Sequence, residues 1–139
     1  MLEKYYKYKL DYRDYLILIK CGSFYECIDT DAFIINKITN YKLKRLSNTF
    51  KAGFPINTLD KVIDKLFDEN INYIIVDNEI TEIKEFDNNT YSNYNFNDKD
   101  IFYNSIRIER IIKSLNDNLT NKDFTNVLNK IENIIKDKL

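Results

Sequence analysis

The chain has 139 residues, 44% hydrophobic and 31% charged, with a formal net charge of −1, which is typical of one globular domain and excludes wholesale disorder. It has no histidine and only two cysteines, so it lacks the commonest ligands for a metal site and the commonest general base. No charged-then-apolar leader opens the sequence, and no apolar run approaches the roughly 18 residues of a membrane span, so we expect a cytoplasmic protein with no membrane association.

The first thirty residues predict a helix followed by a hairpin. Mixed apolar and charged residues favour a helix over 2–13, and the apolar run 15–20 is typical of a strand buried on both faces. A second strand is expected over 24–29. Gly22 and Ser23 would then form a two-residue turn in which Gly22 supplies a positive φ.

The segment up to residue 86 continues with alternating elements. Asp31 is expected to cap a short helix, and either Asn57 or Thr58 to cap a longer one. The period-two pattern of the intervening runs indicates strands. The expected order through residue 86 is α, β, β, α, β, β, α, β, β, with the later elements at 32–39, at 41–46, within 48–57, and at 59–70, 72–77 and 79–86.

The rest of the chain has a different character. Residues 87–98 are polar and turn-prone and predict a loop or linker after a module at 1–86. Residues 99–139 predict an amphipathic helical hairpin, whose second helix would start at a capping box of Thr120 and Asp123. This hairpin would either cover a face of the sheet or bind a protein partner, including a second copy in a homodimer.

Two blocks in the first module resemble a known family. The sequence LILIKCGSFYECIDTDAFIINK, followed by KAGFPINTLDKVIDKLFDENINYIIVDN, resembles the amino-terminal mismatch-recognition domain, domain I, of the DNA mismatch-repair protein MutS. That family has a strand, a Gly-Asp-Phe-Tyr-Glu turn, a helix, and then Ala-Gly-Val/Ile-Pro before another helix and strand. The resemblance covers about residues 1–86. It implies an α/β fold with a mixed sheet of about six strands flanked by helices, here followed by the helical hairpin.

The resemblance also implies site residues at the hairpin. The family's wedge phenylalanine, which stacks beside a mispaired base, corresponds to Phe24, and the glutamate that hydrogen-bonds this base corresponds to Glu26. Phe24 and Glu26 are two apart in a strand and so share a face, while Tyr25 points to the other face. Lys20 takes the place of the basic residue before the turn, and Ser23 the place of the aspartate.

The chain's two glycines both lie inside the matched blocks. Gly22 and Gly53, with Pro55 shortly after, indicate backbone conformations that other residues adopt only at a cost. Ordinary turn chemistry explains them equally well. They therefore support the fold more strongly than they support DNA binding.

A basic window follows the hairpin. No acidic residue lies between Asp31 and Asp60, whereas residues 61–139 hold 11 basic and 15 acidic side chains, a balance of −4. The window is expected to contact DNA phosphates, and the alternative is a solvated basic face. Its five basic residues are Lys37, Lys42, Lys44, Arg45 and Lys51.

These patterns favour a binding protein over an enzyme. No G-x-x-x-x-G-K-[ST] motif occurs, so the chain carries no MutS-type ATPase, and Glu26 has no partner at a spacing typical of catalysis. We expect no catalytic residues, no metal and no cofactor. The leading hypothesis is a non-enzymatic module that recognises mismatched or distorted double-stranded DNA. The alternative is an interaction or inhibitor protein, encoded on a phage or other mobile element, that reuses this fold.

Overall fold

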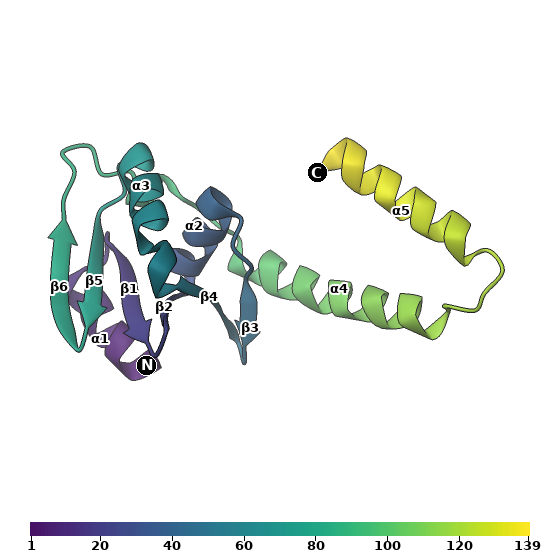
Figure 1. Cartoon of the computed structure of the whole chain (residues 1–139), viewed down its shortest axis with the longest axis horizontal. Helices are drawn as coiled ribbons and strands as arrows, with labels where there is room; N and C mark the ends of the chain where they lie inside the picture. The colour runs from purple at the N-terminus through teal and green to yellow at the C-terminus, as the bar shows by residue number, and fades with distance from the viewer. The chain divides into compact units, whose positions relative to one another are not determined.

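A six-stranded sheet lies at the centre of residues Met1–Asn97, the first of two units in the computed structural model, which describes residues 1–139 (Figure 1). The strand order across the sheet is β3-β4-β2-β1-β5-β6. Only β1 and β5 pair in parallel, so the sheet is mixed, as expected. The elements of this unit are α1 (Leu2–Asp11), β1 (Leu16–Cys21), β2 (Phe24–Ile28), α2 (Thr30–Thr39), β3 (Lys44–Leu46), β4 (Thr49–Pro55), the 3-10 turn η1 (Ile56–Thr58), α3 (Leu59–Glu69), β5 (Tyr73–Asp77), β6 (Glu79–Lys84) and the 3-10 turn η2 (Tyr91–Asn93).

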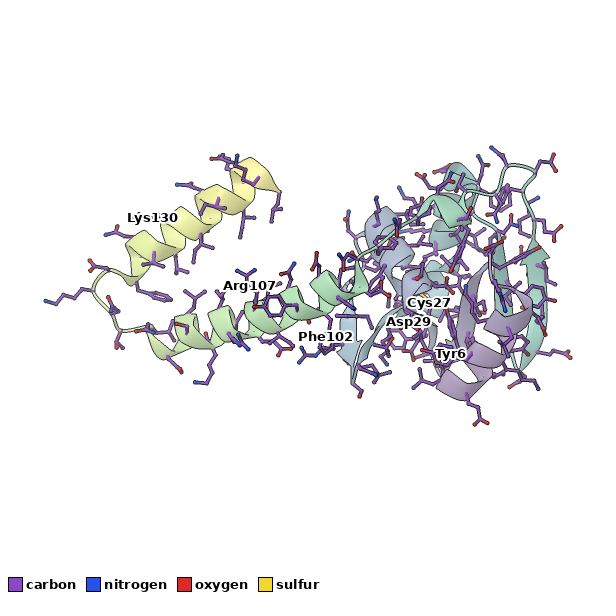
Figure 2. The ribbon with its side chains drawn as sticks, turned by 180° about the vertical axis from the view of Figure 1, so that it is seen from behind. Tyr6, Cys27, Asp29, Phe102, Arg107 and Lys130 are labelled. Atoms are coloured by element: carbon purple, nitrogen blue, oxygen red, sulfur yellow. The ribbon has the colours of Figure 1, made fainter.

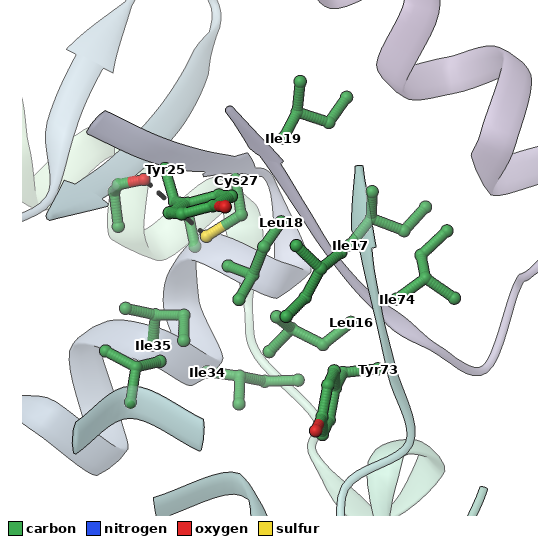
Figure 3. Packing of buried hydrophobic residues seen from close by; sticks show 14 of the residues in the cluster. Leu16, Ile17, Leu18, Ile19, Tyr25, Cys27, Ile34, Ile35, Tyr73 and Ile74 are labelled. Carbon is green, nitrogen blue, oxygen red and sulfur yellow. Dashed lines mark hydrogen bonds between the residues drawn. The ribbon is translucent and has the colours of Figure 1, made fainter. Parts of the chain in front are cut away.

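Helices cover both faces of this sheet. In Figure 1, α2 and α3 lie in front of the strands, and in the reverse view of Figure 2 it is α1 that lies in front. The central strands β1 and β5 are therefore buried on both sides, which explains why both are continuous apolar runs. Figure 3 shows Leu16 and Leu18 of β1 on the side that α2 covers, near Ile34 and Ile35.

A buried carboxylate joins the two helical layers. The side chain of Asp31 is 0% exposed and accepts hydrogen bonds from Lys9 Nζ at 3.0 Å, the backbone N–H of Ile17 at 3.0 Å, Tyr91 Oη at 2.5 Å and Tyr5 Oη. Burial, together with the charge of Asp31, raises the pKa of both tyrosines. The expectation that Asp31 caps α2 is wrong, because its carboxylate is used in this cluster and the cap position lies two residues earlier.

The segment after β6 packs on this unit. It was expected as a polar loop or linker over 87–98, and its residues up to Asn97 belong to the first unit. Tyr91 is 7% exposed, and the ring of Phe96 lies 5.4 Å from that of Phe33 in α2. These aromatic contacts hold an otherwise polar segment against the first unit.

The second unit, Asp98–Leu139, consists of two helices, α4 (Asp98–Asp117) and α5 (Phe124–Lys138). The N-cap of α5 is Asp123, without a side-chain cap bond, so the capping box expected from Thr120 is wrong. Neither helix has a buried residue. No helix of the protein combines the length and apolar character needed to cross a membrane. Large apolar residues that are about half exposed or more include Tyr103, Ile108, Ile111, Ile112, Leu119, Ile134 and Ile135.

Candidate functional site

The β1–β2 hairpin ends in a tight turn. Cys21 pairs with Phe24, so Gly22 and Ser23 alone form the turn, and Gly22 has a φ of +60° as expected. Glycine with positive φ at the first turn position is what a type II′ hairpin requires. The backbone N–H of Ile56 donates to the carbonyl oxygen of Ser23 at 3.0 Å, which ties the tip of the hairpin to the start of η1.

The strand after the turn presents two side chains on one face. Phe24 and Glu26 alternate with Tyr25, which is 7% exposed and packs in the core. Phe24 is 46% exposed although it is a large aromatic residue. In β4, Pro55 lies opposite Phe24 and Gly53 lies opposite Glu26. The antiparallel register thus places the second glycine beside the glutamate.

Basic residues surround this face. Lys51 of β4 pairs with Lys44 of β3, so both side chains project on the same side of the sheet as Gly53. With Lys42 they complete a pocket of about 360 Å³. Three lysines and one glutamate give the lining a net charge of +2. The residues that line the pocket are Phe24, Glu26, Lys42, Lys44, Lys51 and Gly53.

Glu26 forms an ion pair inside the pocket. Lys51 Nζ lies 2.8 Å from Glu26 Oε2, and the side chains are 27% and 17% exposed. The thiol of Cys21 lies beside the same carboxylate; burial first, and then the charge of Glu26 and its hydrogen bond, raise the pKa of this thiol. The glutamate is therefore held in place from two neighbouring strands.

Gly53 makes room for this carboxylate. A Cβ atom at Gly53 would lie 3.3 Å from Glu26 Cγ and 3.3 Å from the carbonyl oxygen of Tyr25, tighter than ordinary contact. Only Gly22 among the glycines has a positive φ. The expectation of an unusual backbone conformation is thus confirmed for Gly22 and wrong for Gly53, where the reason for glycine is space.

The other predicted contacts lie elsewhere. Lys20 pairs with Tyr25, so it projects on the face opposite to Glu26, where its ammonium lies 3.3 Å from Asp77. Arg45 lies opposite Phe50 and so also projects on the other face of the sheet from Lys44.

The basic window therefore divides. Lys37 of α2 lies over the ring of Tyr94, 5.8 Å from its centroid. Of the five basic residues in the window, only Lys42, Lys44 and Lys51 line the pocket beside Phe24.

Sequence reasoning missed the Glu26–Lys51 pair. A weak signal was present, since Lys51 and Gly53 are two apart and so share a face of their strand, as Phe24 and Glu26 do. The sequence pattern did not show that β2 pairs with β4, nor the register of that pairing.

Nowhere in the protein do three cysteine, aspartate or glutamate side chains lie close enough together to hold a metal ion.

Comparison with known proteins agrees with this architecture. The family described as MutS domain I matches residues 1–105. The chain is 32% identical over 77 residues to the DNA mismatch repair protein MutS of Thermotoga petrophila, and 38% identical over 66 residues to that of Thermosipho melanesiensis. These matches cover 55% and 48% of this chain but only 10% and 8% of the relatives.

The matched region thus contains every element of the first unit, including the hairpin with Phe24 and Glu26 and the strand with Gly53. The same order of strands and helices was expected from the residues alone, and the sheet is the mixed, six-stranded one that the resemblance implied. The chain belongs to the MutS domain I family.

Proposed function

We propose that the first unit is a non-enzymatic DNA-binding module that recognises mismatched or distorted duplexes, with Phe24 as an aromatic wedge. The observation that carries this proposal is the exposure of Phe24, 46%, at the rim of a pocket with a net charge of +2. The pocket's lysines supply attraction for phosphates, and the family membership supplies the precedent, since its relatives are DNA mismatch repair proteins.

The energetics favour distorted DNA over regular duplex. Inserting an aromatic side chain from the minor groove requires unstacking, which costs a few kcal/mol at a paired step and less at a mismatch. Stacking on Phe24 returns roughly 1–3 kcal/mol. The net gain is therefore largest where base pairing is already weak, and the wedge acts as a sensor of weak pairing.

Binding by this unit alone should be weak and salt-dependent. If Lys42 and Lys44, the two pocket lysines that do not pair with Glu26, each contact one phosphate, the logarithm of the binding constant falls by about 1.8 per tenfold rise in salt. The chain spans about a tenth of the MutS relatives, so the activity of those whole proteins is not carried over to it. The proposal is limited to recognition, without catalysis or cofactor.

Fluorescence polarisation tests the wedge. We expect wild type to bind duplexes with a G·T mismatch or a single-base bulge more tightly than perfect duplex at low salt, and Phe24→Ala to remove that preference. Phe24→Leu should restore only part of it, because leucine fills space without stacking. Tyr103→Ala, which removes an exposed aromatic residue from α4, is the matched control. Mismatch preference unchanged in Phe24→Ala would refute the wedge.

A second candidate function belongs to the helical unit. Exposed isoleucines along α4 and α5 favour binding to a protein, either a partner or a second copy of this chain, and this would suit an interaction protein of a mobile element. Light scattering tests the second copy directly. A dimer in wild type that becomes a monomer in Ile108→Lys or Ile112→Lys would support self-association. A monomer in wild type would limit the candidate to a different protein partner.

A further inference from the structure

The pocket's only carboxylate has a specific partner. Three lysines line the pocket, yet it is Lys51, at 2.8 Å, that holds Glu26. Lys51 reaches diagonally across the β2–β4 pairing, past Gly53, which lies directly opposite Glu26 and has no side chain to block it. Both side chains are more than two-thirds buried. The ion pair is therefore part of the built structure of the pocket and not a contact between two mobile surface chains.

We propose that Lys51 is a specificity-determining positioning residue, which holds Glu26 for reading a displaced base and neutralises it beside the DNA, while Lys42 and Lys44 contact phosphates. This inference rests on the proposed function of the unit. It assigns different tasks to lysines that the sequence presents as one basic window.

The chemistry of the carboxylate supports this division. An unpaired carboxylate facing phosphates is repelled by them and loses hydration when DNA covers the pocket, and an ammonium at hydrogen-bonding distance offsets both costs. A carboxylate has about four acceptor positions. The contact with Lys51 uses one at Oε2 and the hydrogen bond with the Cys21 thiol uses another, which still leaves acceptors for N–H donors on an unpaired base. The same contact fixes the direction in which those acceptors point.

A matched pair of lysine variants separates the two tasks. Lys51→Met and Lys44→Met each remove one positive charge from the same pocket, and the two residues lie opposite each other in paired strands. The quantity to measure is the ratio of dissociation constants for perfect and G·T-mismatched duplex. We expect Lys44→Met to weaken both complexes equally and to lower the salt slope by about 0.9. Lys51→Met should reduce the ratio by roughly tenfold, the lower end of what a hydrogen bond to a charged group supplies.

A double-mutant cycle with Glu26→Gln tests whether Lys51 acts through the glutamate. We expect Lys51→Met to have no further effect on the ratio in the Glu26→Gln background, and Lys51→Arg to restore the wild-type ratio by keeping the ion pair. Equal weakening of both complexes by Lys51→Met would make Lys51 a phosphate contact, and an undiminished effect on the ratio in the Glu26→Gln background would show that Lys51 does not act through Glu26; either result overturns the inference alone. Wild type that binds both duplexes equally would overturn the proposed function, and the inference with it.

Discussion

Two lysine–carboxylate pairs in the first unit have the same chemistry and opposite surroundings. Asp31 is 0% exposed and is bound by Lys9, two tyrosine hydroxyls and a backbone N–H, so its acceptor positions are largely used. Glu26 is 17% exposed, is bound by Lys51 and opens into the pocket beside Phe24. Both pairs join segments that are distant in sequence, yet only the second has acceptors facing solvent.

The difference gives Asp31 a structural environment and leaves Glu26 open for the binding role proposed for it. A buried charge is tolerated only when its hydrogen-bonding capacity is satisfied, and breaking such a cluster leaves uncompensated charge in the interior. We call Asp31–Lys9 the closed pair and Glu26–Lys51 the open pair. Breaking the open pair should lower the free energy of unfolding only slightly, and its carboxylate keeps acceptors for a ligand. We therefore expect substitutions of Asp31 to lower the stability of the fold and to have little direct effect on DNA binding. Substitutions of Glu26 should change DNA binding and have little effect on stability.

The largest expected effect is the difference in stability between variants that neutralise Asp31 and Glu26. Asp31→Asn should lower the free energy of unfolding by about 3 kcal/mol, because it leaves Lys9 without its counter-charge beside a buried cluster. Glu26→Gln should change it by less than about 1 kcal/mol. Urea denaturation followed by circular dichroism measures both. Equal losses of stability in the two variants would contradict the distinction between the closed and the open pair.

A second test compares the two glycines near the open pair, Gly22 in the hairpin turn and Gly53 beside Glu26. Gly22→Ala should destabilise by about 1–2 kcal/mol, because alanine is strained at a φ of +60° although its Cβ would meet no atom within 4 Å. Gly53→Ala should cost about 1 kcal/mol and displace Glu26, whose Cγ is 3.3 Å from the new Cβ.

Mismatch preference distinguishes these glycine variants better than stability does. We expect Gly53→Ala to reduce the preference under conditions where both variants are folded, and Gly22→Ala to retain more of it. The reverse order would show that Gly53 does not act through Glu26. Thermal unfolding curves recorded alongside the binding data provide the control for folding.

The smallest effect concerns alkaline pH and the closed pair. Burial and Asp31 raise the pKa of Tyr91 above its unfolded value of about 10, so this tyrosine stabilises the fold fully below pH 10 and progressively less as pH rises towards the folded pKa. By pH 10.5 the loss at this site should be about 0.8 kcal/mol. Tyr91→Phe should be less stable than wild type at pH 8, and the gap should narrow by pH 10.5.

Urea denaturation at the two pH values measures this gap, with Tyr103→Phe, outside the cluster, as the control. Tyr5 contacts the same carboxylate and remains in the Tyr91→Phe variant, so its titration is common to both proteins. A gap between wild type and Tyr91→Phe that stays constant with pH would contradict the assigned effect of Asp31 on Tyr91.

The order of strands and helices could be predicted because each element has a local period. The apolar runs at β1 and β5 and the alternation at β6 are signals within a few residues, and the turn at Gly22 follows from glycine chemistry. The predicted caps at Asp31 and Thr120 were wrong for the opposite reason. A polar residue near a helix start can cap the helix or serve a tertiary cluster, and only packing decides between these roles.

The part of the candidate site that depends on the alternation of side chains along one strand could be predicted from the sequence. The shared face of Phe24 and Glu26 follows from their spacing, and the resemblance to MutS domain I identified both residues. The division of the basic window was not predictable, because it depends on which face of the sheet each side chain takes. That face is set by the pairing of β3 with β4 and of β4 with β2.

The sequence by itself determined the order of elements, the hairpin turn and the family, because these depend on local periodicity, on glycine and on short motifs. Tertiary structure alone decided that Asp31 lies in a closed cluster, that Gly53 makes room for Glu26, and that Lys51 rather than Lys20 or Arg45 reaches the pocket. The physical reason is strand register. A shift of one residue reverses the face of every side chain in a strand, and the buried core that fixes this register is assembled from residues throughout the first unit.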